Sequence, residues 1–180
     1  MRYLFNLDCS GSMETCWDDA IGGFNSFVAD QAAQQPNSTL TLKQFDHEIR
    51  TTFENVPFKD VRPLTRETFV PRGSTALLDA IGETVKGGVP GEPATLIILT
   101  DGHENSSKTY TKVHIKDLLE QKQKEGWTII YLGANQDAFA EAGSMGIAAA
   151  NTVNYDATRT PDAFRALSQT VSSQASVNRS

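Results

Sequence analysis

Apolar residues follow two spacings along this chain, one typical of buried strands and one typical of amphipathic helices. Short apolar runs predict strands, whereas apolar residues at i, i+3 and i+7 predict helices. Strands are expected at residues 3–7, 40–45, 49–53, 96–99, 127–132 and 152–155. Helices are expected at residues 14–34, 78–85, 115–126, 137–142 and 160–171. Residues 55–73 contain three prolines and are expected to form an irregular connection.

The alternation of strands with helices predicts an α/β protein. We expect a three-layer, doubly wound, Rossmann-like sheet that is mostly parallel. The runs at 40–45 and 49–53 are joined by a short polar turn, which predicts a hairpin with one antiparallel edge strand. In such sheets ligands bind beyond the carboxyl ends of the strands. The segments just after Leu7, Leu99 and Leu132 are therefore where a site is expected.

Composition narrows the class of protein. The 180 residues suit one domain, expected at residues 1–172, with a frayed tail at 173–180. The net charge is −6 and there is no Lys/Arg block, which argues against nucleic acid or an anionic membrane as partner. No apolar run approaches the roughly 20 residues that cross a bilayer, and no signal peptide is recognisable. We expect a cytoplasmic chain with two reduced cysteines, although the spacing of Cys9 and Cys16 also permits a disulfide.

Oxygen-bearing side chains gather at the predicted strand ends. Asp8, Ser10 and Ser12 follow the first strand, Thr75 opens a helix after a Gly-Ser pair, and Asp101 follows the central strand. These are hard oxygen donors, which suit Mg²⁺ better than zinc or copper. The three scattered histidines do not suggest a zinc site. Helix capping is the alternative role for the same Asp, Ser and Thr residues.

This combination resembles the von Willebrand factor A (vWA) domain with a metal-ion-dependent adhesion site (MIDAS). The five matching residues are Asp8, Ser10, Ser12, Thr75 and Asp101, in the order of the family motif. The resemblance covers residues 2–171 and implies the vWA fold. Residues 132–137 are also similar to stand-alone bacterial and bacteriophage members. The resemblance implies that the five residues form a site for Mg²⁺, with Mn²⁺ or Ca²⁺ as other ions that such oxygens accept.

The resemblance also implies a mode of action. The two serines would bind the ion directly, Thr75 directly or through water, and Asp8 and Asp101 largely through water. Neutral hydroxyl ligands leave the charge of the ion poorly balanced, so an Asp or Glu carboxylate of a protein partner would complete its coordination. The chain is thus expected to be a metal-dependent protein-binding module, and a monomer alone. Movement of the last helix, residues 162–171, between two states is a hypothesis carried over from relatives.

Two other functions are alternatives. One is an adaptor or regulator of a MoxR-type AAA+ ATPase, a frequent companion of bacterial relatives. The other is a metal-assisted hydrolase or phosphotransferase, but we expect no enzyme. Ser10 stands where a haloacid-dehalogenase-type phosphatase needs its second Asp, and Gly-x-Ser-x-Gly and nucleotide-binding motifs are absent. His103 and Glu104 follow Asp101 and are expected to be solvated loop residues. Glu14, Asp18 and Asp19 either add negative potential near the first loop or stabilise a helix start.

Overall fold

The structure, a computed structural model, describes residues 1–87, 92–101, 106–134, 138–155 and 160–179. His103 and Glu104 lie outside the described residues, as do residues 135–137 of the stretch that resembles stand-alone relatives. Six strands form one sheet: β1 (Arg2–Asp8), β2 (Thr39–Phe45), β3 (Ile49–Pro57), β4 (Thr95–Thr100), β5 (Thr128–Ala134) and β6 (Thr152–Tyr155). Their order is β3-β2-β1-β4-β5-β6. Every pairing is parallel except that of β2 with β3. The predicted fold class is confirmed, including its antiparallel edge strand.

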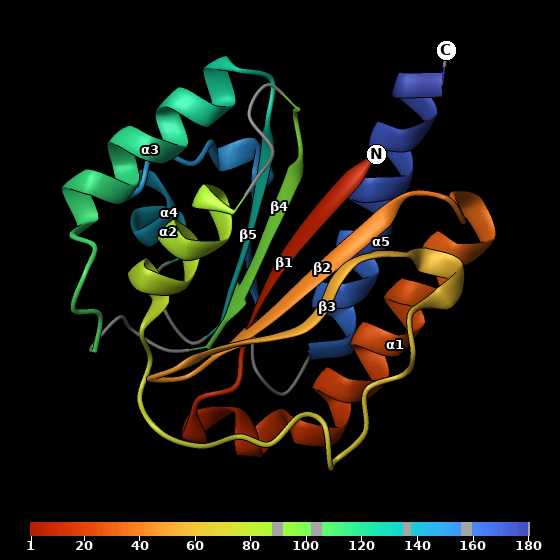
Figure 1. Ribbon diagram of the computed structural model, residues 1–180, viewed down its shortest axis with the longest axis horizontal. Helices are drawn as coiled ribbons and strands as arrows, with labels where there is room; N and C mark the ends of the chain where they lie inside the picture. The colour runs from red at the N-terminus through yellow and green to blue at the C-terminus, as the bar shows by residue number, and fades with distance from the viewer. Residues whose placement is uncertain (88–91, 102–105, 135–137, 156–159, 180) are drawn as a thin grey trace.

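Helices cover both faces of this sheet (Figure 1). The α-helices are α1 (Trp17–Gln34), α2 (Leu77–Lys86), α3 (Lys112–Lys124), α4 (Ala138–Ser144) and α5 (Thr160–Arg179). Three short 3₁₀ helices lie at Gly11–Cys16, Phe58–Asp60 and Ala149–Asn151. In Figure 1, α1 and α5 lie on one face, and α2, α3 and α4 lie on the other. Because side chains alternate along a strand, β1 contributes to two separate cores.

The core between the sheet and α1/α5 is rich in aromatic rings. Phe5 of β1 packs edge-on against Phe24 of α1, with ring centroids 5.6 Å apart, and stacks on Phe164 of α5 at 6.3 Å. Phe164 also covers Gly23, where an added Cβ would lie 2.3 Å from its ring. The core on the other face is mainly aliphatic and includes Leu4. Both faces of β1 are thereby buried. The same holds for β4, whose Ile97 and Leu99 lie in the first core and whose Leu96 and Ile98 lie in the second, as its continuous apolar sequence indicates.

The structure adjusts the predicted bounds of several elements. The expected helix at 14–34 starts with the 3₁₀ turn Gly11–Cys16 before α1 begins, and β3 runs on to Pro57. The predicted irregular connection is confirmed from there to α2, apart from the short 3₁₀ turn Phe58–Asp60. It buries Phe58, Leu64 and Phe69 in the core, because prolines prevent regular structure without preventing burial. The helix α5 continues through residues 173–179, a segment with no Gly or Pro to end it.

Within the described residues, no helix combines the length and the apolar character needed to span a membrane.

Candidate metal centre

The sheet order brings together the loops that carry the five candidate residues. β1 lies between β2 and β4, and Leu7 is paired with Leu99, so Asp8 and Asp101 follow strands that end side by side. Four of the five residues are buried and one is exposed. The exposed fractions are Asp8 0%, Ser10 2%, Thr75 4% and Asp101 7%, whereas Ser12 is exposed. The site is therefore a buried polar cluster with one open side at Ser12.

Hydrogen bonds join four of the candidate residues into one network. Asp8 accepts through Oδ1 from the Ser10 N–H (2.7 Å) and through Oδ2 from the Thr100 hydroxyl (2.7 Å). The hydroxyl oxygens of Ser10 and Ser12 lie 3.2 Å apart. The Ser12 hydroxyl donates to Asp101 Oδ1 at 2.8 Å. The chain from Asp8 to Asp101 thus runs through the two serines that the motif places between them.

Thr75 reaches the same place through backbone bonds between loops. The Gly11 N–H donates to Gly73 O at 3.0 Å, and the Arg72 N–H donates to Cys9 O at 2.8 Å. Gly73 has a positive φ of 72°, a left-handed conformation that glycine adopts without strain. Residues 9 and 11 therefore bind the 72–76 segment, while residues 8, 10 and 12 make the polar network. These bonds hold residues 72 and 73 beside the first loop, two to three residues before Thr75.

A third loop, the β2–β3 turn, braces this arrangement through Asp46. The Asp46 side chain is fully buried, and its Oδ2 accepts from Arg72 Nε at 3.0 Å and from an Arg50 N–H at 3.3 Å. Its Oδ1 accepts from the Glu48 N–H (2.7 Å), and its carbonyl accepts from the Ala76 N–H (2.8 Å). The sequence analysis missed Asp46 and both arginines. The available signal was an Asp directly after the second predicted strand, in line with Asp8 after the first.

The two candidate carboxylates lie where a negative charge is unfavourable. Burial raises the pKa of the Asp8 carboxyl above its usual value, and hydrogen bonds from Ser10 and Thr100 oppose this only in part. Burial, together with the charge of Asp8, raises the pKa of Asp101 to about 6. Among the described residues, no Lys, Arg or His forms an ion pair with either carboxylate. A cation from outside the chain would relieve this repulsion.

The donor set fits a hard divalent ion. Two carboxylates and three hydroxyls supply only oxygen, which Mg²⁺ and Ca²⁺ prefer. In the part of the chain that the structure describes, no three His, Cys, Asp or Glu side chains form a metal-binding group.

The cysteines beside the site are free and buried. Cys9 is fully buried, and its Sγ lies 3.2 Å from a guanidinium nitrogen of Arg50 and 3.9 Å from Asp46 Oδ2. Burial raises the pKa of the Cys9 thiol to about 12, so the thiol stays protonated near neutral pH. The disulfide between Cys9 and Cys16 that the spacing permits is not formed. Cys9 is a small packed residue between Asp8 and Ser10.

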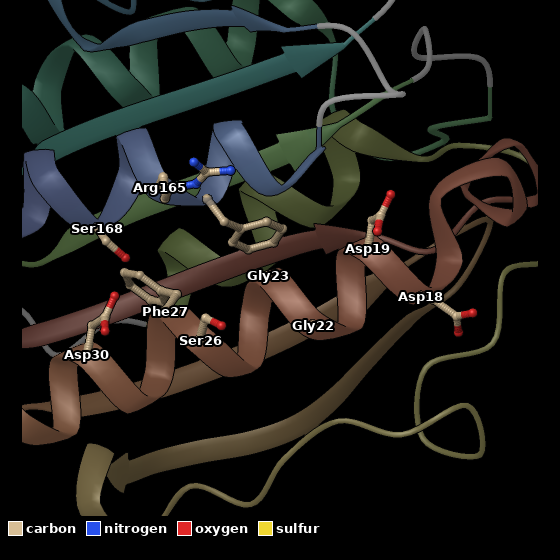
Figure 2. Close-up of a pocket in the computed structure, with 10 residues that line it drawn as sticks. Asp18, Asp19, Gly22, Gly23, Ser26, Phe27, Asp30, Arg165 and Ser168 are labelled. Carbon is tan, nitrogen blue, oxygen red and sulfur yellow. The ribbon is translucent and has the colours of Figure 1, made fainter.

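A separate cavity of about 400 Å³ lies between α1 and α5 (Figure 2). Gly22, Ser26 and Asp30 of α1 line one wall, and Arg165 and Ser168 of α5 line the other. Two charged residues at this cavity already have partners within the chain. Asp18 pairs with Arg66 at 2.8 Å, and Arg165 pairs with Asp162 at 2.7 Å. Because Arg66 balances the charge of Asp18, the pairing argues against a role for Asp18 in adding negative potential near the first loop.

Comparisons with known proteins identify the fold. No protein-family model matches the sequence, and no curated protein matches it. Among solved structures, proximal thread matrix protein 1 from the mussel byssus, with a zinc-occupied MIDAS motif, matches at TM-score 0.65 and 14% identity. That match covers 91% of this chain and 46% of the mussel protein, so this chain spans about half of its length.

Two further structures match over more of their own length. The vWF domain of the type V pili tip protein Mfa5 from Porphyromonas gingivalis has TM-score 0.69 at 11% identity, covering 94% of both chains. Manganese-loaded TRAP protein from Plasmodium vivax has TM-score 0.65 at 14% identity, covering 91% of this chain and 71% of that one. Together with the strand order and the position of the polar cluster, these matches show that this chain has the von Willebrand factor A fold.

Proposed function

We propose that this chain is a divalent-metal-dependent protein-binding module. The observation that carries the proposal is the pair of buried carboxylates, Asp8 and Asp101, which are joined through two serines and have no ion-pair partner among the described residues. A buried charge without a partner is costly, so the arrangement favours a bound cation. Mg²⁺ is the ion we propose, and Mn²⁺ and Ca²⁺ would be accepted by the same oxygens.

Each residue has a role in this proposal. Ser10, Ser12 and Thr75 would supply hydroxyl oxygens to the ion, and Asp8 and Asp101 would balance its charge directly or through water. The bound ion supplies positive charge at the end of the sheet. Because Ser12 is the exposed member of the set, a partner would approach from its side. An Asp or Glu carboxylate of that partner would complete the coordination of the ion.

Two of the matched structures support a divalent ion. The mussel protein has a zinc-occupied MIDAS motif, and the TRAP protein is manganese-loaded. Both ions are divalent, like the Mg²⁺ that we propose here.

The first experiment measures the ion alone. We expect Mg²⁺ and Mn²⁺ to bind wild-type protein in isothermal titration calorimetry and to raise its melting temperature, with EDTA reversing the effect. Asp8→Asn should lose this binding. Asp117→Asn, which changes an exposed carboxylate on α3, should leave it intact. Wild-type protein that binds neither ion would overturn the proposal.

The second experiment tests recognition of a carboxylate. A peptide array presents each sequence twice, with a central Asp or with Asn in its place. We expect Mg²⁺-dependent capture of Asp peptides only, lost with EDTA. Capture that persists in EDTA would place the interface away from the metal. Turnover of a phosphoester with Mg²⁺ would favour the enzymatic alternative, and retention of an AAA+ ATPase from the native host would identify the partner class as the adaptor alternative describes.

A further inference from the structure

Asp79, in the first turn of α2, holds a loop that the sequence places after Asp101. Its carboxylate accepts hydrogen bonds from three consecutive backbone N–H groups, those of Lys108 (2.8 Å), Thr109 (3.0 Å) and Tyr110 (2.9 Å). Its own N–H donates to Ser107 Oγ at 3.0 Å. Four consecutive residues of one loop are thus bound to a single residue of α2.

The same loop is attached to α2 at two further points. The Ser106 N–H donates to the carbonyl of Thr75 at 3.1 Å, four residues before Asp79. The Tyr110 ring packs so closely on Gly82 that an added Cβ there would lie 2.5 Å from it. Residues 106–110 therefore follow α2 from the candidate metal ligand Thr75 to the middle of the helix.

The chemistry of Asp79 makes it an anchor for backbone N–H groups. Both of its oxygens are engaged, Oδ1 by Thr109 and Tyr110 and Oδ2 by Lys108. It also lies in the first turn of α2, where the helix dipole is positive and a negative side chain is stabilising. Hydrogen bonds from N–H groups to a carboxylate are about twice as strong as those to a neutral acceptor. An amide at this position would keep one acceptor oxygen and turn an NH₂ group toward a backbone N–H.

We propose that Asp79 is a positioning residue for the metal centre. By holding residues 106–110 on α2, it fixes the Ser106 bond to Thr75 and so the place of the Thr75 hydroxyl relative to Ser10 and Ser12. This inference rests on the proposed function, since it concerns affinity for the same ion. Residues that orient metal ligands in this way typically change metal affinity by 10- to 100-fold when substituted. We expect Asp79→Asn to weaken Mg²⁺ and Mn²⁺ binding by about 10-fold.

The test compares three variants with wild-type protein by calorimetry with Mg²⁺ and Mn²⁺, at a temperature where circular dichroism shows each to be folded. Asp79→Asn should bind about 10-fold more weakly. Asp79→Glu, which keeps the carboxylate, should recover part of the affinity. Asp117→Asn, an exposed Asp→Asn change on the neighbouring helix α3, should bind like wild type. Recovery by Glu separates a positioning role from a general loss of stability.

Amide hydrogen exchange of wild-type protein gives a readout that does not depend on any variant folding. If the loop and the ion are coupled through Asp79, Mg²⁺ should slow exchange at Lys108, Thr109 and Tyr110. Equal affinity of Asp79→Asn and wild type, or exchange at these amides that Mg²⁺ leaves unchanged, would overturn this inference alone. Wild-type protein that binds no ion would overturn the proposed function, and this inference with it.

Discussion

Two fully buried aspartates, Asp46 and Asp8, lie at the ends of neighbouring strands, and their surroundings differ in charge. Asp46 follows β2 and has two arginines, Arg50 and Arg72, within hydrogen-bond distance. Asp8 ends β1, has no ion-pair partner among the described residues, and lies near a second carboxylate, Asp101. The Asp46 carboxylate therefore has cationic partners within the chain, whereas Asp8 and Asp101 have none among the described residues, and the proposed cation would fill that role.

This comparison favours the Asp8–Asp101 region over the cavity between α1 and α5 as the candidate site. The cavity measures about 400 Å³, but Asp18 and Arg165 in its lining are paired with other side chains. The Asp8 and Asp101 carboxyls are buried, have raised pKa values and have no ion-pair partner among the described residues. Buried carboxylates with perturbed pKa values are typical candidates for functional sites.

The largest expected effect comes from removing both arginines of the Asp46 region. Arg50→Ala with Arg72→Ala leaves the buried Asp46 carboxylate without its two arginine partners, with only the His47 ring still near it at 3.5 Å, which should lower the free energy of unfolding by roughly 3 kcal/mol. Urea unfolding followed by circular dichroism measures this. Arg66→Ala removes an exposed ion pair to Asp18 and a guanidinium that lies over the Trp17 ring, and it should lower the stability much less. If the double variant loses no more stability than Arg66→Ala, the two arginines do not balance the charge of Asp46, and the proposed difference between Asp46 and Asp8 is wrong.

The sequence predicts the fold and the grouping of the five candidate residues for one shared physical reason. Apolar runs identify the parallel strands, and parallel strands bring the residues that follow them to one edge. Asp8 and Asp101 are predictable in this way without knowledge of the loops. Their role as metal ligands stays a prediction, because geometry alone does not place an ion.

The residues that brace the site depend on contacts between distant loops and carry no local signal. Arg72 reaches Asp46 across 26 residues, and Asp79 binds backbone groups 29 to 31 residues away. Phe69 is fully buried, although it lies in a stretch whose prolines predict only an irregular connection. In each case the contact depends on how the loops pack against the sheet. Neither hydrophobic periodicity nor composition contains information on that packing.

The second expected effect concerns the region that lacks a cation. Asp101→Asn removes one of two repelling charges while keeping an oxygen to accept the Ser12 hydrogen bond. Without metal at pH 7, the variant should be more stable than wild type, with a free energy of unfolding roughly 2 kcal/mol higher. With Mg²⁺ the order should reverse, because the variant no longer binds the ion. Chemical unfolding in EDTA and in Mg²⁺ measures the two differences in stability. If Asp101→Asn is less stable than wild type in EDTA, the hypothesis that Asp101 carries an uncompensated charge is wrong.

The smallest expected effect is the dependence of stability on pH, and its sign follows from the raised pKa of Asp101. Folded Asp101 has a pKa of about 6, whereas an unfolded Asp titrates near 4, so the folded chain binds more protons between these values. Without metal, the contribution of Asp101 to stability is therefore full below about pH 4 and is lost as the pH rises through 6. Between pH 5 and pH 7 the loss should be roughly 1 kcal/mol.

Other carboxylates also titrate in this range, so the measured quantity is the difference between wild type and Asp101→Asn. In EDTA that difference should turn against wild type as the pH rises from 5 to 7. In Mg²⁺ the trend should be opposite, because protons compete with the ion for the Asp101 carboxylate and binding strengthens as they leave. The Asp46 region supplies its own cations and should contribute nothing to this metal-dependent change. A difference that is flat with pH in both conditions would show that Asp101 is balanced within the chain, as Asp46 is.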